Sequence, residues 1–149
     1  MGSYVYTTVI QDWSKLDMNW LVGRTIGKVE KVDYSWFFVL DDGSSIGTES
    51  PWRLVTADGI VVTSEDDGHP AGVPDSVNAA ERVIKTVAQS PVNGFELRER
   101  TSDLVLHFAC DAAIDFLSLS CMYDGWRTVH GQHEVFCLGG GRLGEPRKG

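Results

Sequence analysis

The densest group of side chains that could do chemistry is the run Glu65-Asp66-Asp67-Gly68-His69. Carboxylates this close together can hold a cation or meet basic groups on a partner protein. The run lacks the alternating acidic positions and the closing glutamate of a calcium-binding loop. It lies in residues 64–75, an acidic segment with two prolines that is typical of an exposed loop. A patch for a protein partner and a plain solvated loop are therefore the two interpretations, and a metal site is not predicted.

Histidines occur in two further arrangements that could be reactive. His130 and His133 flank a Gly-Gln turn and could share a zinc ion, but a third ligand is missing nearby, because strand alternation turns Glu134 away from His133. His107 and Cys110 could form a nucleophilic pair. His107 sits in an apolar strand, however, and nothing nearby in the sequence would activate the thiol. We predict neither a metal site nor a catalytic pair.

A third set of carboxylates comprises Asp41, Asp42 and Glu49, which could face each other across a hairpin as acid and base. Asp-Asp-Gly is far more typical of turn chemistry, so we predict a turn and no catalytic residues. Gly139-Gly140-Gly141 follows a strand without the Lys-Ser/Thr of a phosphate loop, so no nucleotide, cofactor or metal is expected. The residues that we expect to contact a partner are Glu65, Asp66, Asp67, His69, Asp41, Asp42 and Glu49.

One motif occurs twice. Trp52-Arg53-Leu54-Val55 returns as Trp126-Arg127-Thr128-Val129, and each copy is followed by a turn and an apolar run. A repeated motif built on tryptophan indicates an internal duplication. The repetition favours a structural role, with each tryptophan in the core and each arginine stacked or paired outside. Tryptophan and arginine are also typical of binding hot spots, which leaves that alternative open.

The elements that must position these residues are mostly strands. Helical spacing predicts a short helix over 12–22, and a second helix from a cap at Asp75 or Ser76 to about Gln89. Alternating or continuous apolar runs predict strands over 4–10, 26–32, 36–40, 45–49, 52–55, 60–63, 95–98, 104–108, 114–119, 126–129 and 135–138. Short turns between them require antiparallel neighbours. The predicted fold class is α+β and β-rich, with two similar antiparallel units, each preceded by a helix, packed as a sandwich or a barrel.

The same patterns divide the chain into one domain and a tail. Residues 1–141 are expected to form a single domain made of two repeats, about 12–63 and 76–138. Residues 142–149 are expected to be a mobile tail, because positions 139–149 hold five glycines and few apolar side chains. Cys110, Cys121 and Cys137 lie in apolar surroundings and are expected to be buried free thiols.

The charge of the chain restricts its partners. Its 21 acidic and 13 basic residues give a formal net charge of −8, which opposes binding to nucleic acid or an anionic membrane. The sequence has no apolar run near the ~20 residues of a membrane span, and its first residues lack the features of a signal peptide. An odd number of widely spaced cysteines is typical of a reducing compartment. We expect a cytoplasmic protein with a basic partner.

Several residues resemble a known pattern. Leu21-Val22-Gly23-Arg24, Phe37 followed by Leu40 to Gly43, and Tyr123-Asp124-Gly125-Trp126 are the clearest elements. The chain resembles, over roughly residues 16–141, an uncharacterised bacterial family of domains of unknown function. The small acidic members of that family are similar to the immunity proteins that neutralise polymorphic toxins. The resemblance carries no catalytic residues, and residues 64–91 are longer than the family pattern.

These observations lead to competing expectations of function. The first is a non-enzymatic binding protein, most plausibly an immunity protein, whose acidic loops block a basic toxin domain encoded next to it. The alternative is a small-molecule-binding β-barrel or a small enzyme, because five Trp, six Phe and four Tyr could line a pocket. A third is a structural subunit of a larger assembly.

Overall fold

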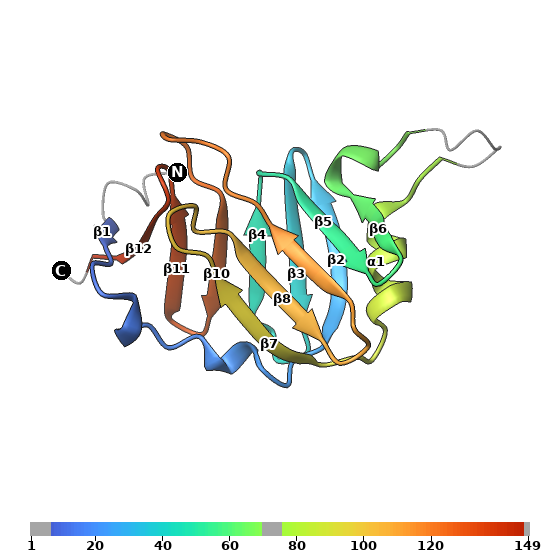
Figure 1. Cartoon of the computed structure of the whole chain (residues 1–149), viewed down its shortest axis with the longest axis horizontal. Helices are drawn as coiled ribbons and strands as arrows, with labels where there is room; N and C mark the ends of the chain where they lie inside the picture. Colours follow the sequence, from blue (N-terminus) through green and yellow to red (C-terminus); the bar gives the residue numbers. More distant parts are fainter. Residues whose placement is uncertain (1–6, 70–75, 148–149) are drawn as a thin grey trace.

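Two antiparallel β-sheets form most of the structure (Figure 1). A computed structural model describes residues 7–69 and 76–147. The strand order is β1-β12-β11-β10-β4-β3-β2 in the seven-stranded sheet and β6-β5-β9-β8-β7 in the five-stranded sheet. The expected β-rich α+β class is confirmed. The expected barrel is not found, because the sheets do not close on themselves in the described part of the chain.

The strands are short and joined mostly by tight turns. The seven-stranded sheet contains β1 (Thr7–Val9), β2 (Ile26–Val32), β3 (Ser35–Leu40), β4 (Ser45–Thr48), β10 (Trp126–His130), β11 (His133–Leu138) and β12 (Arg142–Pro146). The five-stranded sheet contains β5 (Trp52–Thr56), β6 (Gly59–Thr63), β7 (Val92–Leu97), β8 (Leu104–Phe108) and β9 (Ala113–Phe116). Strand β1 occupies part of the strand predicted over 4–10, and residues 4–6 lie outside the described residues.

The two halves of the chain exchange strands between the sheets. The first half places the three-stranded meander β2-β3-β4 in the seven-stranded sheet and the hairpin β5-β6 in the other. The second half places the meander β7-β8-β9 in the five-stranded sheet and returns β10-β11 to the first. The halves meet where β4 pairs with β10 and β9 pairs with β5. This correspondence agrees with two similar units, and their origin by duplication stays a prediction.

The Trp-Arg motifs occupy the predicted positions in these strands. Trp52 and Trp126 begin β5 and β10 and are fully buried. Arg53 faces Asp115 on β9, with 2.6 Å between Nε and Oδ2. The guanidinium of Arg127 lies 5.9 Å from the ring centroid of Phe136 on β11, directly opposite in register. The structural interpretation is confirmed, since one arginine is paired with a carboxylate and the other is stacked on a ring.

Aromatic rings join the two sheets into one core. Phe38 of β3 meets Trp52 of β5 and Phe116 of β9 edge to face, at centroid distances of 5.1 and 5.0 Å. Trp36 meets Trp52 in the same geometry at 5.1 Å. Edge-to-face contacts satisfy the ring quadrupoles and stabilise such pairs beyond simple burial. The sheets are therefore two layers of one hydrophobic core.

The second predicted helix is present and shorter than expected. Helix α1 (Ala79–Val87) begins after Asn78, whose side chain accepts a hydrogen bond from the backbone N–H of Glu81 at 3.0 Å. The predicted cap at Ser76 is wrong, and Asp75 lies outside the described residues. The buried face of α1 consists of Ala79, Val83 and Val87, and it packs against β2 and β6. No helix in residues 7–69 and 76–147 is long and apolar enough to cross a membrane.

The first predicted helix, over 12–22, is wrong. The chain instead makes two single 3₁₀ turns, η2 (Trp13–Lys15) and η3 (Asn19–Leu21). The Asp12 carboxylate accepts a hydrogen bond from Ser14 N, and the Asp17 carboxylate accepts one from Asn19 N, each at 3.0 Å. Such short bonds to the local backbone compete with an α-helix.

The expected mobile tail is wrong for residues 142–146, which form β12 between β1 and β11. Leu143 is fully buried and anchors this strand. The glycines that suggested mobility make the turn before it. A Cβ on Gly141, whose φ is +77°, would lie 1.7 Å from the carbonyl oxygen of Arg100. Only glycine fits this close approach, so the glycines shape a compact turn here.

The expectation of three buried thiols is wrong for two of them. Cys137 is buried, and Cys110 and Cys121 are exposed. Both exposed cysteines lie in connections, after β8 and after β9, where a strand pattern no longer determines which side chains face the core.

Candidate functional site

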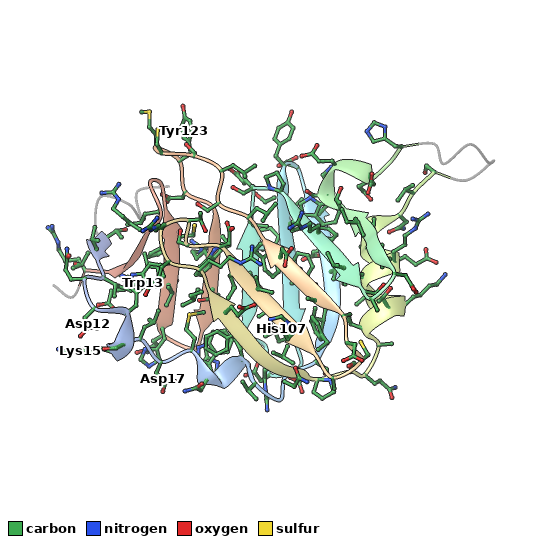
Figure 2. All side chains as sticks on the ribbon, in the orientation of Figure 1. Asp12, Trp13, Lys15, Asp17, His107 and Tyr123 are labelled. Carbon is green, nitrogen blue, oxygen red and sulfur yellow. The ribbon has the colours of Figure 1, made fainter. Side chains whose placement is uncertain are left out.

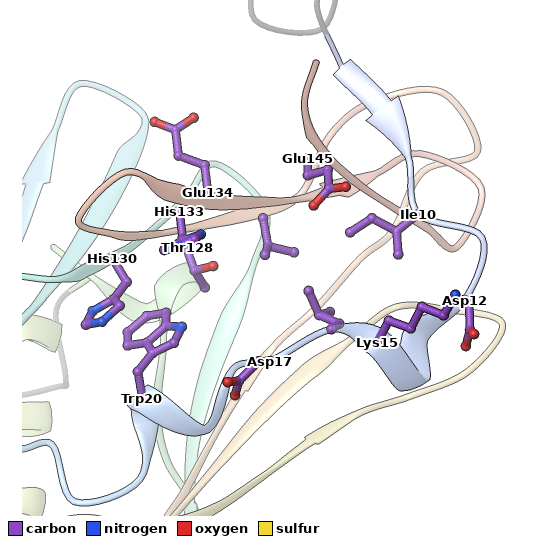
Figure 3. A pocket seen from close by; sticks show the side chains of 12 residues that line it. Ile10, Asp12, Lys15, Asp17, Trp20, Thr128, His130, His133, Glu134 and Glu145 are labelled. Atoms are coloured by element: carbon purple, nitrogen blue, oxygen red, sulfur yellow. The ribbon is translucent and has the colours of Figure 1, made fainter. Parts of the chain in front are cut away.

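A cavity of about 510 Å³ lies between the η2–η3 segment and strands β10 to β12 (Figure 3). One wall comes from the N-terminal segment and the other from the seven-stranded sheet. Thr128, His130, His133 and Val135 occupy one face of the β10-β11 hairpin, because Thr128 pairs with Val135 and His130 with His133. The lining residues are Ile10, Asp12, Lys15, Leu16, Asp17, Trp20, Thr128, His130, His133, Glu134, Val135 and Glu145.

An aromatic stack closes one side of this cavity. Trp20 of η3 lies parallel to the ring of His130, with 4.4 Å between centroids and 6° between planes. His130 Nδ1 lies 3.5 Å from Oδ2 of Asp42, in the β3-β4 turn. Arg24 reaches the same turn, with its guanidinium 3.6 Å from Asp41 and 3.8 Å from Asp42. This chain of contacts fixes His130, and through it Trp20, against the end of the sheet.

Asp42 is the electrostatic centre of this chain of contacts. Burial raises the pKa of its carboxyl, but hydrogen bonds from the Ser44 hydroxyl and backbone N–H, with the nearby Arg24 and His130, lower the pKa more. The net result is a pKa below the ordinary value of 3.8. Asp42 is therefore charged near neutral pH and is held by its turn, as the Asp-Asp-Gly pattern predicted.

Four carboxylates line the cavity, against a single lysine. Asp12 and Asp17 each use one oxygen in the turns described above, and Glu145 extends from β12. In Figure 3, Glu134 points away from the other lining side chains, whereas Glu145 and Asp17 lie on opposite sides of the cavity. None of these four carboxylates takes part in an ion pair within residues 7–69 and 76–147.

The hydroxyl of Thr128 lies at the floor of the cavity without a hydrogen-bond partner. Thr128 is 1% exposed, and Oγ1 is one of three buried side-chain polar atoms in the described residues that lack a partner. Leaving such a group unsatisfied costs about 1–3 kcal/mol. Its oxygen is turned toward the interior of the cavity in Figure 3. An unpaired polar atom at this point favours a ligand that would supply the missing bond.

The acidic run 65–69 follows β6 and holds its own loop in shape. Asp66 closes a capping box on η4 (Ser64–Asp66) with Thr63, whose N–H donates to it at 2.9 Å. Asp67 accepts the first backbone N–H of helix α1, from Ala79, at 2.9 Å. Glu65 and His69 are exposed. Two of the carboxylates therefore order the loop, and their outer oxygens stay on the surface.

The structure divides the expected partner-binding residues between two ends of the molecule. Glu49 accepts a hydrogen bond from the Ser35 hydroxyl at 3.2 Å, at the start of β3. Asp41 and Asp42 follow the end of β3, about 20 Å away along a six-residue strand. Glu49 therefore shares an end with the η4 loop, which approaches Lys31 and Trp36 around a small hollow. Asp41 and Asp42 adjoin the cavity instead.

The other candidate residues do not assemble into a reactive group. His107 Nε2 lies 2.7 Å from Glu96 across β7 and β8, and Cys110 Sγ donates weakly to the carbonyl of Thr86 at 3.7 Å. His130 and His133 are directly opposite each other in β10-β11. No three His, Cys, Asp or Glu side chains in the described stretches are placed to hold a metal ion together.

A second feature is the set of large apolar side chains exposed at the Glu49 end. Leu119, Met122 and Tyr123, in the β9-β10 connection, are 68%, 75% and 75% exposed, and Tyr34 in the β2-β3 turn is 85% exposed. Figure 1 places this connection, this turn and η4 along one edge of the molecule, and Figure 2 shows Tyr123 projecting from it. We name these four side chains with Glu49, Glu65, Asp66 and Asp67 the contact face.

Sequence reasoning missed both the cavity and the apolar part of the contact face. The cavity joins residues 10–20 to residues 128–145, which meet only in the folded chain. Leu119 was expected at the end of a strand over 114–119, but β9 ends at Phe116, and no strand or helix pattern covers Met122 and Tyr123.

Comparisons with known proteins add no information about the site. No family model matches the chain, no curated protein matches it, and no solved structure matches it. The similarity to a bacterial family of immunity-like domains therefore stays a prediction.

Proposed function

We propose that this chain is a binding protein without chemistry of its own, and that it acts as an immunity protein by covering a basic toxin domain. The observation that supports this proposal is the contact face. Four large apolar side chains project into solvent beside four carboxylates. Exposed aromatic and methionine side chains surrounded by polar ones are the usual composition of a protein interface.

The charges of the contact face favour a basic partner. Its carboxylates belong to a chain of net charge −8, so the field extends beyond the individual contacts. Complementary charge accelerates encounter and rejects acidic competitors more than it adds affinity. The apolar side chains would supply most of the binding free energy once the surfaces meet.

The contact face is ordered before any partner arrives. The Ser120 hydroxyl accepts the backbone N–H groups of Met122 and Tyr123, each at 2.9 Å. The N–H of Gly140 donates to the Ser120 carbonyl at 2.9 Å, and a Cβ on Gly139 would lie 2.5 Å from the Met122 backbone. The glycine turn thus braces the loop. A preordered loop loses little conformational entropy on binding, which favours tight association.

The proposal is tested by co-expression with the product of the neighbouring gene. The wild-type chain should restore growth of cells that make this product, and Tyr123→Ala with Met122→Ala should abolish the protection. Ile60→Ala is the matched control, because Ile60 is an exposed apolar residue beside the β5-β6 turn, away from the contact face. A non-toxic neighbour, or equal protection by the double variant, would contradict the proposal.

A further inference from the structure

We propose that the cavity between η2–η3 and β10–β12 binds a small organic cation with an alkyl chain and a guanidinium-type head. This site goes beyond the proposed function, because it adjoins the Asp42 end of β3, whereas the contact face lies at the Ser35 end. Its volume of about 510 Å³ is in the range of small-molecule sites.

The charges lining the cavity select a cation. Asp17, in the η2–η3 connection, and Glu145 of β12 lie on opposite sides of it in Figure 3, and neither has an ion-pair partner among the described residues. Lys15 extends toward Asp12 in Figure 3, on the side away from Trp20. A cation between Asp17 and Glu145 would gain from both carboxylates, and an anion would be repelled by both.

The polar floor selects a head group with N–H donors. The buried hydroxyl of Thr128 lacks a partner, and a guanidinium directs several N–H groups outward in one plane. Such a head could reach a carboxylate with one edge and the hydroxyl with another. The face of Trp20 that is not stacked on His130 would add a cation–π contact.

The remaining wall selects an alkyl chain. Ile10, Leu16 and Val135 supply apolar surface next to the carboxylates. A chain of a few methylenes would cover this surface while its head stays with the charges. A bare metal ion would not contact the apolar surface, and a neutral sugar would not be attracted by the carboxylates.

The direct test is an NMR titration of the full chain with n-butylguanidinium and with n-butylurea, its neutral isostere. We expect saturable shifts of the backbone amides of Asp17, Thr128 and His130 with butylguanidinium, with a Kd on the order of 1 mM. Butylurea should bind roughly tenfold more weakly, because it lacks the charge. Equal binding of the two compounds, or no saturable shift, would overturn the proposal.

Variants separate a ligand role from a structural one. Glu145→Gln should weaken butylguanidinium binding roughly tenfold, and Glu65→Gln on the contact face should leave it unchanged. Thr128→Val should raise the melting temperature of the free protein, because it removes an unpaired buried hydroxyl, and should still weaken binding several-fold. A Thr128→Val chain that binds as well as wild type, or a Glu145→Gln chain that does, would contradict the assignment.

A titration with a short arginine peptide distinguishes a small-molecule cation from an arginine of a partner protein. Acetyl-Ala-Arg-Ala-amide carries the same head group on a protein-like backbone. Binding weaker than that of butylguanidinium supports a small-molecule ligand, because the cavity then excludes the backbone. Tighter binding of the peptide would assign the cavity to a partner's arginine and would overturn the small-molecule proposal.

Discussion

At the scale of single residues, the two motif tryptophans share a position but not a hydrogen bond. The indole N–H of Trp126 donates to the buried carbonyl of Ser102 at 2.8 Å, whereas the indole N–H of Trp52 is buried without a partner. Sequence alone could predict that both rings are buried, because both open apolar strands. It could not predict the difference, because Ser102 lies in a turn that the motif does not contain.

This difference predicts unequal costs of substitution. Trp126→Phe removes a ring segment and leaves the Ser102 carbonyl unsatisfied, whereas Trp52→Phe removes an N–H that had no partner. The first substitution should cost more in free energy of unfolding, by about 1–2 kcal/mol, as measured by urea denaturation. Equal losses, or a larger loss for Trp52→Phe, would show that the hydrogen bond is unimportant.

The charge of Asp42 predicts how the stability of the protein depends on pH. Its pKa in the folded protein lies below the ordinary 3.8, so its charge stabilises the fold at neutral pH, and the effect is lost as pH falls through the folded pKa. Asp42→Asn should lower the Tm by roughly 2–4 °C from pH 7 down to about pH 5, and the gap should narrow as the pH falls below the ordinary pKa of 3.8.

The neighbouring Asp41 provides the control. It lies in the same turn and makes a 3.6 Å contact with Arg24. Asp41→Asn should shift the Tm by less than half as much at neutral pH, since exposed ion pairs contribute little. A gap for Asp42→Asn that does not narrow as the pH falls below 3.8 would refute the role given to its charge.

At the scale of elements, alternating apolar patterns located most strands. The segments that were predicted wrongly depend on hydrogen bonds and strand pairing that such patterns do not contain. Residues 12–22 have helical spacing, yet Asp12 and Asp17 bond to their own backbone and break the helix into two turns. Residues 142–146 look featureless because only Leu143 is a large apolar residue. Their strand depends on pairing with β1 and β11, which are distant or separated by a glycine turn.

The contribution of strand β12 to stability can be tested by substituting one buried and one exposed leucine. Leu143→Ala should cost about 2–5 kcal/mol of unfolding free energy, because the side chain is fully buried between strands. Leu119→Ala, 68% exposed, should change it by less than about 0.5 kcal/mol. Chemical denaturation of both variants measures these changes. An unchanged free energy of unfolding for Leu143→Ala would support a mobile tail instead of strand β12.

At the scale of the whole molecule, strand pairing between the two halves of the chain limited what could be predicted from the sequence. The repeated motif predicted two similar units, and the short turns between strands predicted antiparallel sheets. It could not predict that β4 pairs with β10 and β5 with β9, because each pair joins residues far apart in the chain. The cavity depends on the same long-range assembly, and so it was absent from the sequence prediction. The contact face combines a turn, a loop and a 3₁₀ segment that only the fold brings to one edge.

The interlocking predicts that neither half folds alone. Residues 1–70 would leave β4 and β5 without their β10 and β9 neighbours, and residues 71–149 would lack the complementary strands. Each fragment should give a poorly dispersed NMR spectrum, and the mixture should recover the dispersion of the intact chain. A well-dispersed spectrum from either fragment alone would mean that the halves are independent units.

The central claim is that this scaffold binds a protein partner through its contact face. The most direct measurement is titration calorimetry of the purified chain against the inactivated product of the neighbouring gene. We predict a one-to-one complex whose Kd rises about 30-fold or more with Tyr123→Ala and stays the same with Ile60→Ala. No heat of binding, or an equal change in Kd for the two variants, would contradict the claim.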